Sequence, residues 1–150
     1  MTVIRTESLE QTRDLAAGFA EKISKKRKNK NRALVLLLSG DLGSGKTSFV
    51  QGALRYFGIK RVLSPTFVLM KHYRIPRAKN NIKDIYHVDA YRLKSFADLQ
   101  SLGFDKVLES GKSLVFIEWP ERLRTKVLKN SLKINFSFGE KENERLIKLP

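Results

Sequence analysis

Residues 40–47, Gly-Asp-Leu-Gly-Ser-Gly-Lys-Thr, match the pattern G-x-x-x-x-G-K-[ST] of a phosphate-binding loop. Glycines allow backbone conformations that other residues avoid, so successive N–H groups can turn inward around a phosphate group. In such a loop Lys46 neutralises β- and γ-phosphate oxygens, while the hydroxyl of Thr47 coordinates Mg²⁺. The motif therefore predicts a nucleotide site, and it requires a buried strand before it and a helix after it.

The segments on either side of the motif have the patterns that it requires. Residues 33–38 form a continuous aliphatic run, which is typical of a strand covered on both faces. After the motif, apolar residues recur at helical spacing until Gly58: Phe49, Val50, Ala53, Leu54 and Phe57. An ordinary glycine turn would not need these flanks, so the order of strand, loop and helix favours the phosphate-binding interpretation.

The rest of the chain predicts one α/β domain over residues 1–150. Ser8 and Gln11 have the spacing of a capping box, which begins an amphipathic helix from Leu9 to about residue 25. Two short helices are expected at residues 96–102 and 104–109. Further strands are expected at residues 67–73, 82–88, 113–117, 132–138 and 144–149, the first two separated by a loop around Pro76. This order predicts a P-loop NTPase-like three-layer fold with a mixed, mostly parallel sheet and a C-terminal antiparallel hairpin.

Composition limits the class of protein. The chain has no cysteine, which excludes disulfides, zinc-thiolate sites and thiol catalysis. Its longest apolar run is far shorter than the roughly 20 residues that cross a bilayer, and its start lacks the apolar stretch of a signal peptide. We therefore expect a soluble, cytoplasmic protein with no membrane partner.

The chain carries 30 Lys and Arg against 15 Asp and Glu, a net charge of +15. Such an excess favours nucleic acid or an acidic protein as partner, but a compositional drift toward Lys and Asn explains it equally well. The densest cluster, at residues 25–32, has no apolar residue to bury and predicts an exposed loop.

Two carboxylates follow apolar strands of the predicted sheet. Glu118 ends the run Leu-Val-Phe-Ile-Glu, and Asp89 ends the weaker run Ile-Tyr-His-Val-Asp. In P-loop hydrolases, carboxylates at neighbouring strand ends hold Mg²⁺ or orient the attacking water. The alternative is an acid in solvent or paired with an arginine. Neither residue could be assigned without the loop upstream.

Three other features have weaker signals. The Ser-Pro-Thr sequence ending at Thr66 suits a switch hydroxyl that senses the γ-phosphate, but it is also ordinary turn chemistry. His87 has no second histidine or cysteine at ligand spacing, so packing is favoured over metal binding. Trp119 is expected to be a packing anchor that can also contact nucleotide or a partner.

Taken together, these segments resemble one family. The sequences GDLGSGKTSF, SPTF, YHVDAYRL, DLQSLGFD and FIEWPERL occur in the order and spacing of the bacterial TsaE (YjeE) family of tRNA threonylcarbamoyladenosine biosynthesis ATPases. The resemblance covers nearly the whole chain, and the combination of H-x-D-x-Y-R with I-E-W-P is its most specific part. Ser44 and Ser48 stand where the family often has Ala and Thr, small changes that should leave phosphate binding intact.

The resemblance implies an ATP hydrolase that uses ATP and Mg²⁺. It would serve the threonylcarbamoyl modification of the adenosine that follows the anticodon in tRNAs reading codons that begin with A. It implies docking on a TsaD-like transferase and a TsaB-like partner, with hydrolysis resetting the complex and an indirect contact with tRNA through that complex.

The resemblance also implies roles for individual residues. Thr47 and Glu118 would hold Mg²⁺, Asp89 would be essential for hydrolysis, and Thr66 would lie in a switch-like loop. The nucleotide pocket would be formed by Leu9, Gly43, Ser44, Gly45, Lys46, Thr47, Ser48, Trp119, Glu121 and Arg145.

Two other functions are alternatives to this one. A small-molecule kinase built on the same loop would need an arginine-bearing lid, whereas the basic insertion here precedes the first predicted strand, which is the wrong place for a lid. A basic nucleic-acid-binding module with a structural nucleotide would explain the charge, yet the chain has no aromatic-interleaved RNA platform. Product analysis and salt-dependent tRNA binding discriminate these classes.

Overall fold

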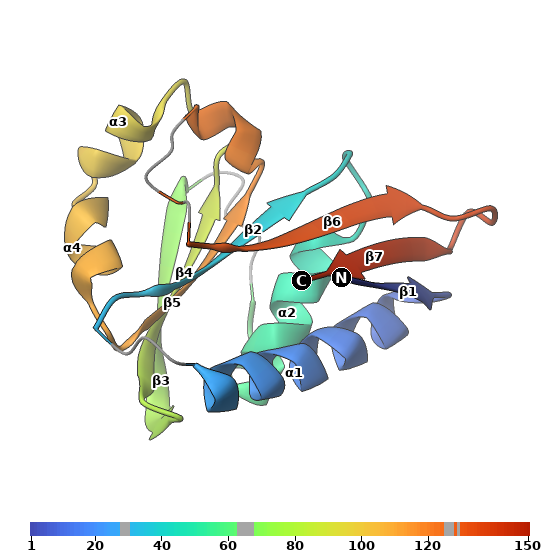
Figure 1. The fold of residues 1–150 in the computed structure, drawn as a ribbon, viewed down its shortest axis with the longest axis horizontal. Coiled ribbons are helices and arrows are strands. Elements are labelled where there is room, and N and C mark those ends of the chain that lie inside the picture. Colours follow the sequence, from blue (N-terminus) through green and yellow to red (C-terminus); the bar gives the residue numbers. More distant parts are fainter. Residues whose placement is uncertain (28–30, 63–67, 125–127, 129) are drawn as a thin grey trace.

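The computed structural model describes residues 1–27, 31–62, 68–124, 128 and 130–150. Within this part of the chain, seven strands form one sheet in the order β1-β7-β6-β2-β5-β4-β3 (Figure 1). The strands are β1 (Thr2–Thr6), β2 (Leu34–Ser39), β3 (Met70–Lys79), β4 (Ile82–Asp89), β5 (Ser113–Glu118), β6 (Leu132–Phe138) and β7 (Arg145–Leu149). The helices are α1 (Leu9–Lys26), α2 (Lys46–Tyr56), α3 (Phe96–Gln100), α4 (Phe104–Glu109) and the 3-10 helix η1 (Pro120–Leu123).

The four central strands run parallel, and each outer strand pairs antiparallel with its neighbour. Strand β2 pairs in parallel with β5 and with β6, and β5 pairs in parallel with β4. The pairs β3–β4, β6–β7 and β1–β7 are antiparallel. This arrangement confirms the predicted mixed sheet with a C-terminal antiparallel hairpin.

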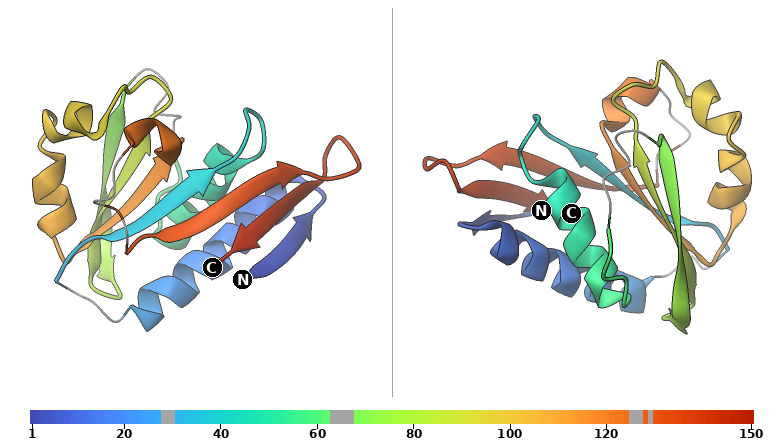
Figure 2. Two further views of the ribbon diagram at one scale, coloured as in Figure 1. Left: turned by 45° about the horizontal axis from the view of Figure 1, so that its top comes forward. Right: turned by 180° about the vertical axis from the view of Figure 1, so that it is seen from behind.

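Helices cover both faces of the sheet. Because side chains alternate along a strand, β2 sends Leu36 and Leu38 to one face and Val35 and Leu37 to the other. The first pair packs in a cluster with α1 and α2, and the second in a cluster with α3 and α4. Figure 2 shows α1 and α2 side by side, away from α3 and α4. The sheet is therefore the middle of three layers, as the sequence predicts.

The prediction of a loop around Pro76 is wrong. Strand β3 continues through Pro76 to Lys79, and the turn into β4 lies at Asn80 and Asn81, whose φ angles are 51° and 65°. Consecutive left-handed residues suit a two-residue hairpin, and asparagine tolerates them. Since β3 is an edge strand, the missing N–H of Pro76 is accommodated where the register shifts beyond Arg74.

Strand β1 lies in a segment for which the sequence predicts no element. It pairs with β7 from Thr2 opposite Leu149 to Thr6 opposite Arg145. A short, largely exposed edge strand has no buried run to mark it, which explains why its pattern is uninformative. The start of α1 at Leu9 agrees with the prediction. No helix within the described ranges is long and apolar enough to span a membrane.

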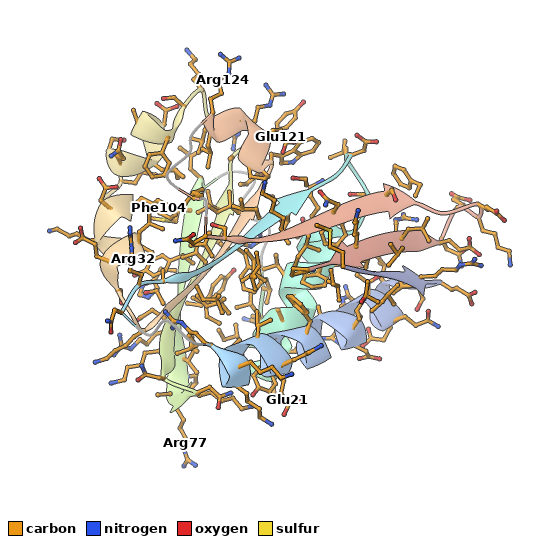
Figure 3. The ribbon with its side chains drawn as sticks, viewed as in Figure 1. Glu21, Arg32, Arg77, Phe104, Glu121 and Arg124 are labelled. Atoms are coloured by element: carbon orange, nitrogen blue, oxygen red, sulfur yellow. The ribbon has the colours of Figure 1, made fainter. Side chains whose placement is uncertain are left out.

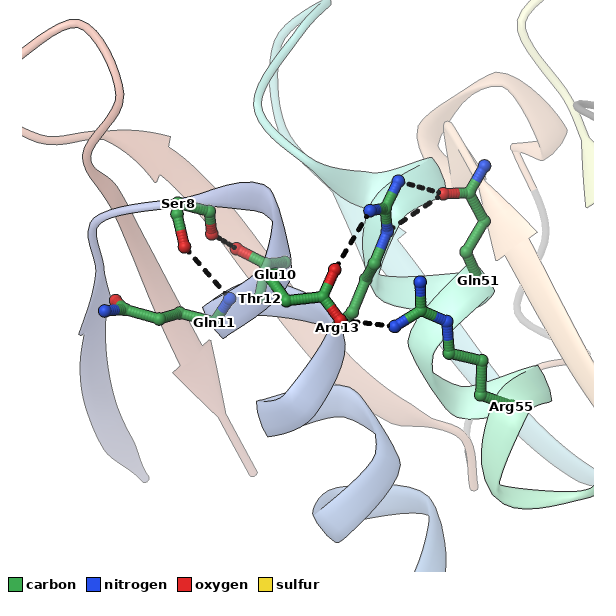
Figure 4. Close-up of polar contacts among 7 residues, drawn as sticks. All are labelled: Ser8, Glu10, Gln11, Thr12, Arg13, Gln51 and Arg55. Atoms are coloured by element: carbon green, nitrogen blue, oxygen red, sulfur yellow. Dashed lines mark hydrogen bonds and ion pairs between the residues drawn. The ribbon is translucent and has the colours of Figure 1, made fainter.

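Helix α1 begins with a cap that differs in detail from the expected capping box. The Ser8 hydroxyl accepts a hydrogen bond from the Gln11 N–H at 3.1 Å, as predicted (Figure 4). The Gln11 side chain accepts from the N–H of Glu7, at 2.7 Å, rather than from that of Ser8. The cap fixes the N-terminal end of α1, which lies near the residues that follow β2.

Helices α1 and α2 pack closely and are joined by polar contacts (Figure 4). Glu10 of α1 forms ion pairs with Arg13 at 3.2 Å and with Arg55 of α2 at 2.5 Å. Arg13 also donates to the Gln51 side chain at 3.0 Å. The close approach requires Gly52, because a Cβ there would lie 2.5 Å from Cα of Arg13.

Replacing Gly52 with alanine should therefore destabilise the fold by about 1–3 kcal/mol, as overpacking does. The matched control is Gly18→Ala, on the exposed side of α1, where an added Cβ meets nothing within 4 Å. That change should stabilise the protein by about 0.5–1 kcal/mol, because alanine loses less backbone entropy in a helix. Urea unfolding followed by circular dichroism measures both, and equal effects would contradict the packing argument.

Candidate functional site

The phosphate-binding sequence forms the turn between β2 and α2. Gly40, Gly43 and Gly45 have φ angles of 150°, 77° and 101°, a region that side-chain-bearing residues rarely occupy. At Gly40 a Cβ would also lie 2.5 Å from the carbonyl oxygen of Phe136, so the turn needs glycine for space as well. Gly45 is the N-cap of α2, whose free N–H groups and positive end therefore face the loop.

A cavity of about 490 Å³ opens beside the loop. Its size is in the range of small-molecule sites. It is lined by residues from α1, the loop, α2 and the ends of β4 and β5: Leu9, Leu42, Gly43, Gly45, Lys46, Thr47, Ser48, Asp89, Tyr91, Glu118 and Trp119. Nine of these belong to the predicted site, which the fold thus gathers from distant parts of the sequence.

Lys46 is held inside the loop. Its Nζ donates to the carbonyl oxygens of Gly40 at 2.5 Å and Asp41 at 2.8 Å, and lies 4.1 Å from the ring centre of Trp119. Burial lowers the pKa of Lys46, while the carboxylates of Glu118, Glu121, Asp41 and Asp89 act in the opposite direction. The Lys46 ammonium group is thus bound by loop carbonyls, which phosphate oxygens would have to replace.

Thr47, Glu118 and His87 form a hydrogen-bonded chain. The Thr47 hydroxyl donates to the Glu118 carboxylate, with 3.0 Å to Oε1 and 3.2 Å to Oε2. His87 Nε2 lies 2.7 Å from Oε1 of Glu118, and both side chains are buried. These hydrogen bonds link α2 to β5 and β5 to β4.

The donor set of Thr47 and Glu118 suits Mg²⁺. Both offer oxygen, which this ion prefers, and it is commonly held by one or two protein ligands together with substrate phosphates and water. In the described ranges, no group of three or more His, Cys, Asp or Glu side chains could hold a metal by itself. The residues present therefore fit an ion that arrives with phosphates.

Asp89 and Trp119 occupy neighbouring strand ends. Asp89 is paired with Glu118 in the parallel register of β4 and β5, and its Oδ1 accepts from the N–H of Tyr91 at 3.0 Å. Trp119 follows Glu118 in a left-handed conformation, with φ 59° and ψ 48°, and its ring centre is 5.0 Å from that of Tyr91. A non-glycine residue in this conformation is strained, and such strain is concentrated at functional sites.

The other predicted residues lie around the loop. Arg145 donates from Nε to the carbonyl oxygen of Gly43 at 3.2 Å and borders a second cavity that also includes Leu9. Ser44, within the loop itself, is fully buried. Glu121, on η1 (Figure 3), accepts from the Ser39 hydroxyl at 3.5 Å and is not among the residues that line the main cavity. Thr66 lies outside the described residues, as does part of the basic cluster at residues 25–32.

Sequence reasoning missed three residues of this site. Leu42 and Tyr91 line the cavity, and His87, which was interpreted as a packing residue, contacts Glu118. The signal for His87 was its spacing from Asp89, because residues two apart on a strand point to the same face. Sequence alone could not use this signal, since it does not say which strand lies beside β4.

Comparisons with known proteins agree on one family. The sequence model described as "Threonylcarbamoyl adenosine biosynthesis protein TsaE" matches residues 6–147. A protein of Rickettsia prowazekii named "tRNA threonylcarbamoyladenosine biosynthesis protein TsaE" is 32% identical over 141 residues, which are 93% of this chain and 88% of the relative. The protein of the same name from Bacillus subtilis is 34% identical over 101 residues, which are 67% of this chain and 59% of the relative.

A solved structure is similar over most of the chain. The crystal structure of Bacillus subtilis YdiB has a TM-score of 0.64 and 26% sequence identity, and the similarity covers 97% of this chain and 82% of that one. The similarity therefore extends over almost the whole of the fold described above.

The contact between Lys46 and Trp119 can be followed by fluorescence, because Trp119 is the only tryptophan of the chain. Nucleotide should draw Lys46 away from the ring, so adding ADP should change the emission in a saturable manner. Lys46→Met should alter the emission without nucleotide and abolish the titration. Arg122→Met, which removes a cation from the Tyr91 ring instead, is the control and should respond like the wild type. A Lys46→Met protein that still titrates normally would refute the role of Lys46.

Proposed function

Because the chain belongs to the TsaE family of tRNA threonylcarbamoyladenosine biosynthesis proteins, we propose that it is an Mg²⁺-dependent ATPase of that pathway. The observation that carries this proposal is the convergence of Lys46, Thr47 and Glu118 on one cavity of nucleotide size. A module that only bound nucleic acid would have no use for a carboxylate next to the Thr47 hydroxyl. The proposed ATPase domain is the whole of residues 1–150.

The residues of the cavity divide the chemistry between them. Backbone N–H groups of residues 43–48 hold the phosphates at the positive end of α2, and Lys46 exchanges its carbonyl partners for β- and γ-phosphate oxygens. Bound Mg²⁺, held by Thr47 and Glu118, would neutralise charge on the phosphate oxygens. Asp89 lies at the adjacent strand end, where its carboxylate can orient a water molecule and accept its proton.

The rim of the cavity supplies the remaining contacts. Trp119 and Leu9 offer apolar surface for the base or the ribose, and Arg145 steadies the loop through Gly43. Thr66 and Glu121 are proposed as further contributors on the strength of the resemblance. Among the described residues, Lys46 is the one cation that lines the cavity, so the charge that develops during phosphoryl transfer is incompletely balanced.

This shortage of cationic groups suggests that the isolated chain hydrolyses ATP slowly and that a partner completes the site. The TsaD-like transferase and its TsaB-like partner are the proposed binding proteins, with hydrolysis resetting their complex between turnovers. tRNA is contacted through the complex in this proposal.

Substitutions in the cavity should separate binding from hydrolysis. Asp89→Asn should lower ATP hydrolysis by roughly 10²–10⁴-fold, the usual contribution of a general base, while ADP affinity stays near that of the wild type. Lys46→Ala should lose nucleotide binding itself. Asp84→Asn is the control, because it removes a carboxylate from the same strand β4 outside the cavity. Phosphate release measures hydrolysis, and calorimetric titration measures ADP affinity. An Asp89→Asn protein that hydrolyses ATP at the wild-type rate would refute the role of Asp89 as general base.

Reconstitution tests the biological role. With matched TsaD-like and TsaB-like proteins, tRNA and ATP, modified nucleoside should accumulate beyond one turnover only when this chain is present. The products should be ADP and free phosphate, because a kinase would instead leave a phosphorylated acceptor. Multiple turnovers in the absence of the chain would overturn the proposal.

A further inference from the structure

We propose that His87 is a positioning residue, which holds the Glu118 carboxylate in place for Mg²⁺. By doing so it sets how much more tightly the site binds nucleotide when Mg²⁺ is present. The inference rests on the proposed function, since it takes Thr47 and Glu118 as the groups that hold the metal.

The place of His87 follows from the register of the sheet. His87 is paired with Phe116 and Asp89 with Glu118 along the parallel strands β4 and β5. Ile85, two residues before His87, packs with Phe116 in the cluster that includes α1 and α2. His87 therefore points toward α2, and Glu118 is its diagonal neighbour on the same face.

The hydrogen bond has a defined direction. An ionised carboxylate only accepts hydrogen bonds, so His87 must donate from Nε2 to Oε1 of Glu118, across 2.7 Å. In the neutral ring Nδ1 then carries no proton, and among the described residues this atom has no hydrogen-bond partner. The tautomer that the contact requires is also the one that leaves no buried N–H group unpaired.

Packing alone does not account for a histidine here. The side chain is fully buried, and burying an imidazole costs free energy that a leucine or phenylalanine would not. Within the described part of the chain, its polar contact is the single bond to Glu118. The group that gains from this bond is the carboxylate.

Two bonds from two different elements orient that carboxylate. Thr47 of α2 can donate its one hydroxyl proton to either oxygen, at 3.0 and 3.2 Å, and so leaves the carboxylate free to turn. The second bond, from His87 of β4, fixes Oε1 and thereby directs Oε2. Partners that orient metal ligands in this way commonly contribute 10-fold to 100-fold, roughly, to metal affinity.

The test compares His87→Gln with His87→Met. The two replacements have nearly the same length and shape, but only glutamine carries an N–H group at the same number of bonds from the backbone as Nε2. ADP binding is measured by calorimetry with Mg²⁺ and with EDTA, and folding by thermal melting. His87→Met should lose about 10-fold or more of the Mg²⁺-dependent gain in affinity, as expected for a partner of a metal ligand, and should keep its affinity in EDTA. His87→Gln should retain most of the gain.

A shorter donor and a double-mutant cycle complete the design. His87→Asn presents its N–H closer to the backbone, out of reach of Oε1, and should behave like His87→Met. If His87 acts through Glu118, His87→Met should have no further effect on the Mg²⁺-dependent gain in a Glu118→Gln protein.

Several outcomes would overturn the inference. Equal Mg²⁺-dependent gains for His87→Met and the wild type would refute the role of His87 and leave the ATPase proposal standing. A His87→Met protein that fails to fold, or that loses EDTA binding equally, would make the role structural. A wild-type protein without any Mg²⁺-dependent gain would refute both the proposed metal site and this inference.

Discussion

The parallel pairing of β5 with β2 on one side and with β4 on the other is the constraint on which the site depends. It sets Leu38 beside Glu118 and Glu118 beside Asp89, so the loop that leaves β2 and the two strand-end carboxylates meet at one edge of the sheet. A shift of one residue in either register would turn the carboxylate to the opposite face. The buried side chains of the three strands prevent such a shift, because both faces of β5 are packed.

The same edge carries groups that a stable core would avoid. Lys46, Glu118 and His87 are all buried, and the strained Trp119 follows directly. Each polar group is retained by a specific partner, and partial loss of such a network is costly because it leaves a charge unpaired away from water. In the proposed function, the loop is thus arranged around contacts that nucleotide and Mg²⁺ would replace, rather than around contacts that maximise stability.

The sequence predicted those parts whose signals are local. The loop and α2 follow from short patterns. Asp89 and Glu118 follow from apolar runs that end in an acid, and the loop upstream favours a place in the site for these carboxylates over one in solvent. The extent of β3 did not, since Pro76 normally breaks a strand and only its place at the edge of the sheet makes it acceptable.

Non-local pairing explains the other differences. Strand β1 forms because it pairs with the edge of β7, and no pattern in residues 2–6 predicts that pairing. The contact between His87 and Glu118 could not be predicted for the same reason, because the sequence does not show which side chain lies across from a histidine in a strand. Both cases depend on contacts between residues more than 30 positions apart.

The net charge of the whole chain does not predict the charge of the candidate site. The net charge is +15, yet Lys46 is surrounded by the carboxylates of Asp41, Asp89, Glu118 and Glu121. A triphosphate entering this cavity meets an acidic surface with one cation among the described lining residues. Like charges at this range in a partly buried site repel, so in the proposed function a divalent cation between Glu118 and the phosphates strengthens nucleotide binding. The proposed gain in affinity from Mg²⁺ therefore follows from the local balance of charge, and the positive excess elsewhere on the surface does not remove it.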